Sequence, residues 1–187
     1  MPDMDANNTE KGTISICFVE EALRGIRQRG FDCNALLLQA GISPELLSSP
    51  QARVSSTHYG QLWHGIAQTL DDEFFGMDSH RMKAGSFTLL CHTLIHSDSL
   101  ERALRRALRF LGLVLDDMAG ELHCEAGVAR IVLRDTGAAA PKRAFAYGTY
   151  LLILHGLACW LVGRRIPVLR ADFRCPEPGF SSEWRIL

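Results

Sequence analysis

The first half of the chain repeats apolar residues at helical spacing. The clearest case lies between residues 55 and 70, where apolar side chains recur every three or four positions. These side chains are Tyr59, Leu62, Trp63, Ile66, Ala67 and Leu70. Such spacing predicts a helix with one buried stripe. Similar patterns predict helices over residues 14–29, 34–40, 85–96 and 100–111, the last capped by Ser97-Asp98, and Ser43-Pro44 predicts one helical turn.

The pattern changes near residue 113. Three short runs, over residues 113–118, 121–125 and 128–134, are separated by Ala119-Gly120 and Ala126-Gly127, which favour tight turns. We therefore expect a three-stranded antiparallel meander. A long helix then begins at Pro141 and ends near Gly163, and the alternation over 168–174 predicts a fourth strand.

The predicted fold class is α+β. A helical subregion over residues 13–112 precedes a subregion over 113–187, in which a small antiparallel sheet of three to four strands is covered by the long helix. Residues 1–12 are polar and predict a flexible tail before one domain, since 187 residues fit the usual size of a single domain.

Charge and composition exclude some classes of protein. The 20 Lys and Arg nearly balance the 21 Asp and Glu, which argues against an autonomous nucleic-acid binder. The six cysteines form no CxxC pair, and the amino terminus has no signal-peptide core. We expect no apolar run to approach the roughly 18 residues that a transmembrane helix needs. These features predict a reduced, cytoplasmic protein with no membrane partner.

Motifs that carry catalysis or bind a cofactor are missing from the sequence. There is no GxSxG elbow, Gly-rich phosphate loop or GxGxxG motif, so we predict no catalytic residues and no cofactor. His92 and His96 share a helical face, but spacing indicates no third ligand, so we predict no metal site. The arginines at 102, 105, 106 and 109 form a basic face, which is either solvated or docks an acidic partner.

Aromatic side chains with polar tips suggest a ligand pocket. Such residues suit the lining of a site for a small organic molecule, although the same residues can be plain core. We expect a pocket between the helical half and the sheet, lined by Trp63, Phe87, His92, Tyr147, Tyr150 and His155.

Several segments together resemble one family. They are Gly41-Ile42-Ser43-Pro44-Glu45-Leu46-Leu47, Phe74-Phe75-Gly76-Met77, the helix from Phe87 to Leu94, and Ser99-Leu100-Glu101-Arg102-Ala103-Leu104. Their order resembles the amino-terminal effector domain of AraC-type transcription regulators, in the arabinose-binding-domain-like branch, over most of residues 14–184. The family's "T-L-x-E-A-L" motif differs here, with Ser99 in place of Thr and Arg102 in place of Glu.

The resemblance implies a sensor that is not an enzyme. It implies a homodimer that binds a small metabolite, which could be amino-acid-like, and that reaches DNA only through a carboxy-terminal helix-turn-helix domain missing from these 187 residues. The apolar end at residues 183–187 leads us to expect a domain truncated there. Two alternatives stay open: a small cytoplasmic enzyme that uses the same aromatic pocket, and a haem-based gas sensor with His96 as axial ligand.

Overall fold

The computed structural model describes residues 13–137 and 141–181, and its chain divides into two compact units, residues 1–70 and 71–187. The tail expected at residues 1–12 and the apolar end at 183–187 lie outside the described residues. The sequence placed the internal change at residue 113, whereas the structure divides the chain after Leu70. The helices over 86–94 and 100–114 therefore belong with the hairpin that follows them.

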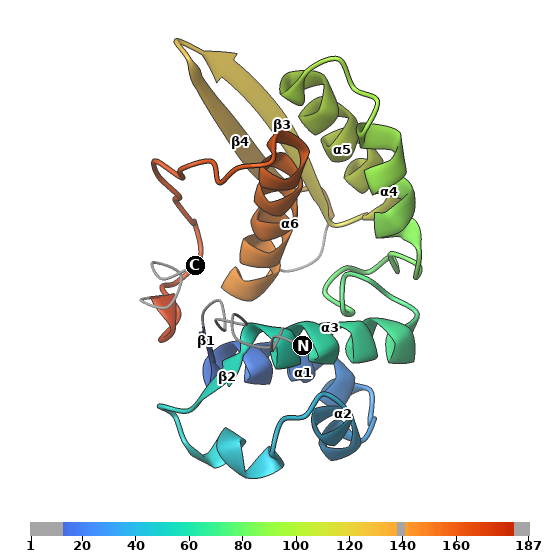
Figure 1. Ribbon diagram of the computed structural model, residues 1–187, viewed down its shortest axis with the longest axis vertical. Helices are drawn as coiled ribbons and strands as arrows, with labels where there is room; N and C mark the ends of the chain where they lie inside the picture. The colour runs from blue at the N-terminus through green and yellow to red at the C-terminus, as the bar shows by residue number, and fades with distance from the viewer. Residues whose placement is uncertain (1–12, 138–140, 182–187) are drawn as a thin grey trace, which may run out of the picture. The chain divides into compact units, whose positions relative to one another are not determined.

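The first unit is mainly helical (Figure 1). It contains α1 (Ile16–Gln28), α2 (Cys33–Gln39), the 3₁₀ helix η1 (Pro44–Ser48) and α3 (Ser56–Leu70). These four elements confirm the predicted helices. The sequence did not predict the short antiparallel ladder of β1 (Thr13–Ser15) with β2 (Arg53–Ser55), which precedes α1 and α3.

Apolar stripes hold the first unit together. The α3 residues Leu62 and Ile66 are fully buried, as the predicted stripe requires, and α1 buries Leu23 and Ile26. Helix α3 packs against both α1 and α2. Asp32 caps α2, because its carboxylate accepts hydrogen bonds from the backbone N–H groups of Asn34 and Ala35.

The second unit combines three helices with one hairpin. They are α4 (Ser86–Leu94), α5 (Leu100–Val114), β3 (Met118–Glu125), β4 (Val128–Asp135) and α6 (Ala144–Val162). Helix α5 packs against β3 and α6, and α4 packs against α5 (Figure 1). Together with the first unit, this arrangement confirms the α+β fold class.

The sheet of the second unit is smaller than expected. Residues 113–114 complete α5 and Gly120 lies inside β3, so the predicted meander is a two-stranded antiparallel hairpin in the described part of the chain. The segment over 168–174 forms no ladder there, and Val168 and Leu169 are exposed. The predicted cap is also wrong, since Ser99 accepts the hydrogen bond from the Arg102 N–H at the start of α5.

The turn between β3 and β4 confirms the predicted break at Ala126-Gly127. Both residues have positive φ, 49° and 78°, and the ladder pairs Glu125 with Val128 across them. Such a two-residue turn favours Asn-Gly, because alanine is strained at positive φ. Ala126→Asn is expected to raise the free energy of unfolding by about 0.5–1 kcal/mol in urea denaturation. Ala129→Asn, within β4, is the control and should bring no gain; an equal gain in both variants would contradict the turn argument.

Helix α6 overturns the expectation about apolar runs. Its 19 residues carry no Asp, Glu, Lys or Arg, and an 18-residue window has a mean hydropathy of 1.6. By length and composition this helix is sufficient to cross a membrane, and 44% of the window is buried inside the protein. A core helix passes the same test, so α6 does not by itself indicate a membrane protein.

Candidate functional site

Tyr150 occupies the centre of the second unit. Its side chain is fully buried in α6, and its ring meets the Phe74 ring edge-on, with centroids 6.4 Å apart. The hydroxyl has no hydrogen-bond partner among the described residues. It lies beside Gly120 of β3, where a Cβ atom would stand 3.2 Å from the phenol oxygen. Burial raises the pKa of Tyr150 to about 12, so the phenol stays neutral.

Tyr147 joins α6 to the hairpin. Its hydroxyl donates to the carboxylate of Asp135, the last residue of β4, at 2.8 Å, and accepts the backbone N–H of Lys142 at 3.0 Å. Burial, with the Asp135 carboxylate beside it, raises the pKa of the Tyr147 phenol. On neighbouring turns of α6, the Tyr147 hydroxyl is therefore hydrogen-bonded, whereas the Tyr150 hydroxyl has no partner among the described residues.

His155 forms a hydrogen bond to the segment that follows α6. Its Nε2 lies 2.8 Å from the carbonyl oxygen of Ile166 and 3.5 Å from Sγ of Cys159. That sulfur in turn accepts the backbone N–H of Ile166 at 3.3 Å. The His155 ring is therefore already engaged by the protein.

The other three predicted residues lie elsewhere. Phe87 and His92 are exposed on α4, and no described hydrogen bond or ring contact joins them to Tyr147, Tyr150 or His155. Trp63 belongs to the first unit, where its ring lies 5.4 Å from that of Tyr59. The structure thus groups the α6 residues on one helix and does not gather all six residues in one described cluster.

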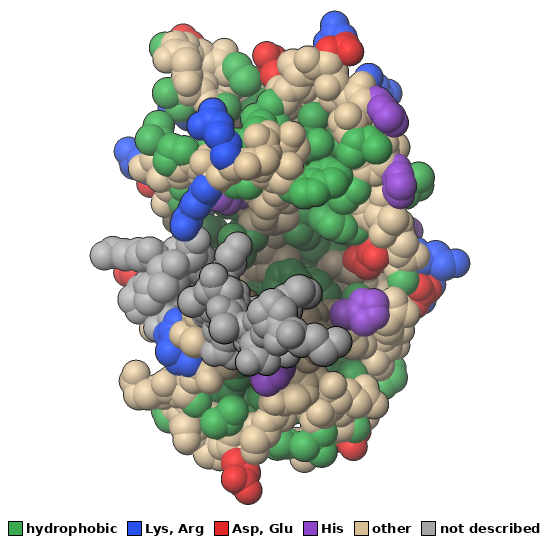
Figure 2. Space-filling view, viewed as in Figure 1, with side chains coloured by type: hydrophobic (Ala, Val, Ile, Leu, Met, Phe, Trp, Pro, Cys, Tyr) green, Lys and Arg blue, Asp and Glu red, His purple; other side chains and the backbone are tan. Residues whose placement is uncertain are grey.

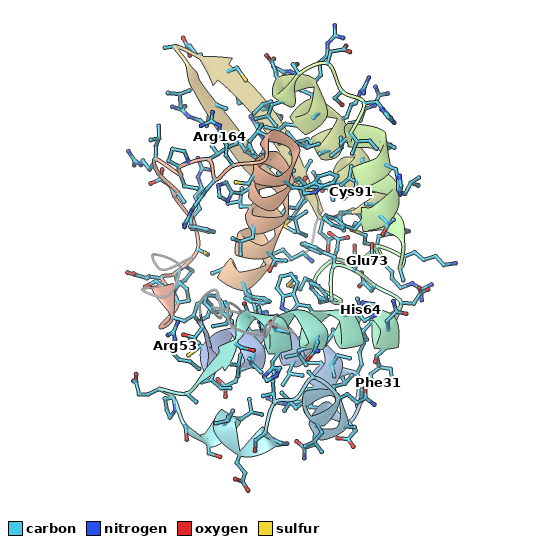
Figure 3. The ribbon with its side chains drawn as sticks, viewed as in Figure 1. Phe31, Arg53, His64, Glu73, Cys91 and Arg164 are labelled. Atoms are coloured by element: carbon cyan, nitrogen blue, oxygen red, sulfur yellow. The ribbon has the colours of Figure 1, made fainter. Side chains whose placement is uncertain are left out.

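Two carboxylates, the buried Asp72 and the half-buried Glu73, organise the segment before α4, and no sequence motif indicated them. Asp72 accepts the backbone N–H groups of Phe74, Gly76 and Met82 at 2.7–3.0 Å. Glu73 accepts those of Gly85 and Phe87 at the start of α4 (Figure 3). The only signal in the sequence is the acidic run at 71–73, whose partners become visible only once the chain has folded.

Asp78 and Asp117 extend this carboxylate network to the hairpin. Asp78 accepts the N–H groups of residues 116 and 117, just before β3. Asp117 accepts two hydrogen bonds of 2.7 Å from Ser79 and pairs with Lys142. The hydrogen bonds from Lys142 and Ser79 hold the pKa of Asp117 below its usual value. The network is a structural support, because its members are used by backbone groups and by Lys142.

Half of the arginines on the basic face of α5 form ion pairs with acidic residues nearby in the chain. Arg102 pairs with Asp98 and Arg105 with Glu101, one turn earlier in each case. Arg105 also donates to the carbonyl of Leu122 on β3 at 3.1 Å. Two of the four arginines are therefore paired with nearby acidic residues.

Exposed hydrophobic side chains lie among the charged ones over the surface (Figure 2), and the most exposed include Leu113 and Leu169.

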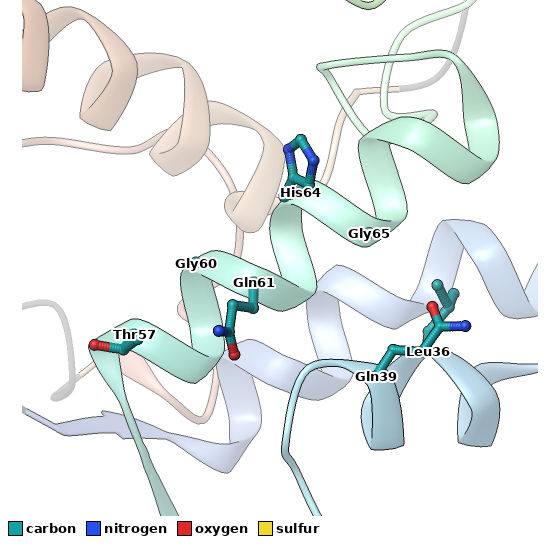
Figure 4. A pocket seen from close by; sticks show the side chains of 7 residues that line it. All are labelled: Leu36, Gln39, Thr57, Gly60, Gln61, His64 and Gly65. Carbon is teal, nitrogen blue, oxygen red and sulfur yellow. The ribbon is translucent and has the colours of Figure 1, made fainter.

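A pocket opens in the first unit between α2 and α3 (Figure 4). Its volume is about 550 Å³, and its lining consists of Leu36, Gln39, Thr57, Gly60, Gln61, His64 and Gly65. None of the six predicted site residues lines it. Sequence periodicity could not have indicated it, because its lining is the polar side of α3, opposite the buried stripe.

The sequence is similar to those of known proteins. Residues 30–186 match the family described as the arabinose-binding domain of AraC transcription regulators, N-terminal. The chain is 25% identical over 181 residues to the ornithine utilization regulator of Pseudomonas aeruginosa, a match that covers 91% of this chain and 51% of that protein. The chain thus spans about half the length of the curated relative that it matches. No solved structure matches it.

Proposed function

Because this chain belongs to the family of N-terminal arabinose-binding domains of AraC transcription regulators, we propose that it senses a small-molecule effector on behalf of a DNA-binding regulator. The family consists of ligand-binding regulatory domains and is not an enzyme family. Effector binding would select one conformation and bias DNA binding elsewhere in the regulator, a coupling typically worth about 1–3 kcal/mol. The regulator is proposed to act in the cytoplasm.

The effector site is proposed at the tyrosines of α6. The observation that carries this proposal is the buried Tyr150 hydroxyl, which has no hydrogen-bond partner in the described part of the chain. Nearly all buried polar groups in proteins are hydrogen-bonded, so an unpaired one calls for an explanation. A bound effector would supply the missing partner. Phe87 and His92 of α4 are proposed as further contacts on the basis of the sequence, and His155 as a residue that positions the end of α6. Trp63, in the other unit, stays a sequence prediction.

The proposed effector is amino-acid-like. Asp135 offers an exposed carboxylate that already holds the Tyr147 hydroxyl, and it could receive an ammonium group. The relative named above is a regulator of ornithine utilization, which makes L-ornithine a reasonable first probe. No residue here indicates a sugar, so L-arabinose is the comparison compound.

The regulator is proposed to act as a homodimer and to contact DNA through a part outside this chain. This proposal rests on the family and on the near-neutral charge of the sequence. Sedimentation equilibrium should give twice the monomer mass, and a gel-shift assay with this chain alone should show no retardation of DNA at physiological salt. A monomer mass at all concentrations would contradict the proposed homodimer. A clear retardation of DNA would contradict the proposal that DNA is contacted outside this chain.

Tyr150→Phe separates ligand binding from folding. The lost hydroxyl bonds to none of the residues that the structure describes, so the variant should unfold with the wild-type free energy or up to about 1 kcal/mol above it. Its affinity for L-ornithine in isothermal titration should fall about tenfold, the effect of one lost hydrogen bond.

Tyr59→Phe is the matched control. The Tyr59 hydroxyl donates to the Phe18 carbonyl at 3.3 Å, so this variant should lose about 1 kcal/mol of stability and keep its affinity. Full affinity in Tyr150→Phe would refute the placement of the site. A wild-type chain that binds no L-ornithine would refute the choice of effector.

A further inference from the structure

The pocket between α2 and α3 presents exposed polar side chains that the described part of the protein does not itself bind. Thr57, Gln61 and His64 recur at helical spacing along α3, and they line the pocket together with Gln39 of α2 (Figure 4). Within the described residues none of these four side chains makes a hydrogen bond to the protein. They can all be used by a molecule that enters the pocket, with Leu36 as an apolar floor.

Gly60 is a second, independent indication. It lies in the middle of α3, where glycine weakens a helix relative to alanine. Packing gives no reason for it, because a Cβ atom built there meets nothing within 4 Å. Gly65 differs, since its Cβ would stand 3.5 Å from Leu36, where the two helices pack. An absent side chain at position 60 leaves the α3 backbone open to a ligand.

The lining defines the ligand's chemistry. It contains no carboxylate, ammonium or guanidinium group, so a charged ligand would find no counter-charge from any of these three groups. Each glutamine carboxamide presents a donor beside an acceptor, which pairs best with another amide. A volume of about 550 Å³ lies within the range of small-molecule sites.

We propose that the α2–α3 pocket binds a neutral small molecule that carries an amide group. This site is separate from the α6 tyrosines, which belong to the other unit, and its failure would leave the proposed function standing. The ligand's amide pairs with Gln61 and Gln39, and its apolar part rests on Leu36 and the open backbone at Gly60.

The test uses nicotinamide as the probe and nicotinate, its charged counterpart of the same shape, as the comparison. Amide NMR shifts of the whole chain at pH 8 should change at residues of α2 and α3 with nicotinamide, with a dissociation constant on the order of 1 mM for so small a molecule. Nicotinate should bind at least about fivefold more weakly. No change on α2 and α3, or equal binding of both compounds, would overturn the proposal.

Two glycine-to-leucine variants distinguish a loss of nicotinamide binding from a loss of folding. Gly60→Leu fills the pocket and replaces glycine by a strong helix former, so binding should be lost while the melting temperature rises by ~2–4 °C. Gly156→Leu is the control, because it sits within α6 and also has open space around its Cβ. This variant should bind nicotinamide as the wild type does. Unchanged binding in Gly60→Leu would overturn the proposal.

Discussion

Replacing Asp72 with alanine is expected to lower the free energy of unfolding by about 3–4 kcal/mol, a large share of a typical domain's stability. The Asp72 side chain is buried and accepts three backbone N–H groups, from Phe74, Gly76 and Met82. Alanine would leave these donors without a partner, and each buried orphan costs about 1–3 kcal/mol unless water reaches it. Urea denaturation followed by circular dichroism measures the loss.

Asp71→Asn is the matched control for Asp72→Ala. Asp71 is less buried, has a φ of 48° and accepts the Ala84 N–H, and asparagine tolerates that backbone and can still accept the bond. The control should change the free energy of unfolding by no more than about 0.5 kcal/mol. A loss below 1 kcal/mol in Asp72→Ala would show that the segment before α4 does not depend on this carboxylate.

Asp117→Asn is expected to cost about 2–3 kcal/mol at pH 7 and much less in acid. The Asp117 carboxylate is buried, paired with Lys142 and bonded to Ser79, and its pKa lies below the ordinary value. A carboxyl with a lowered folded pKa stabilises the protein above its unfolded pKa and loses that contribution as the pH falls through the folded pKa. The difference between wild type and variant should therefore shrink below about pH 4.

Asp116→Asn provides the comparison for that pH dependence. Its exposed carboxylate makes no hydrogen bond to the described residues. The difference in unfolding free energy between this variant and the wild type should stay within about 0.5 kcal/mol from pH 3 to pH 7. A constant difference for Asp117→Asn across the same range would contradict the ionic role of Asp117.

Helices could be predicted from the sequence because their signal is local. The stripe of α3 and the apolar run of α6, which ends at Gly163, are visible within windows of 15 to 20 residues. The β1–β2 ladder could not be predicted, since each strand has three residues and the partners are 38 to 42 positions apart. Glycine and alanine at 119–120 misled the prediction of the sheet, because Gly120 gives space to Leu108 and Tyr150 and makes no turn.

The effector site stays a proposal, and the sequence pointed to only some of the residues around it. Aromatic spacing identified Tyr147 and Tyr150, because both project from one helix. It could not show that one hydroxyl has a partner on β4 while the other has none, since this depends on residues far along the chain. Asp72 and Asp117 escaped detection for the same reason, because a carboxylate that bonds to backbone groups leaves no motif.

The most direct measurement observes the tyrosine rings themselves. The chain contains three tyrosines, so ¹³C-tyrosine labelling gives three ring signals that Tyr→Phe variants assign. On titration with L-ornithine, the signals of Tyr150 and Tyr147 should shift together and saturate with the calorimetric affinity, while the signal of Tyr59 stays in place. Saturable binding that moves neither α6 tyrosine would contradict the placement of the effector site on α6.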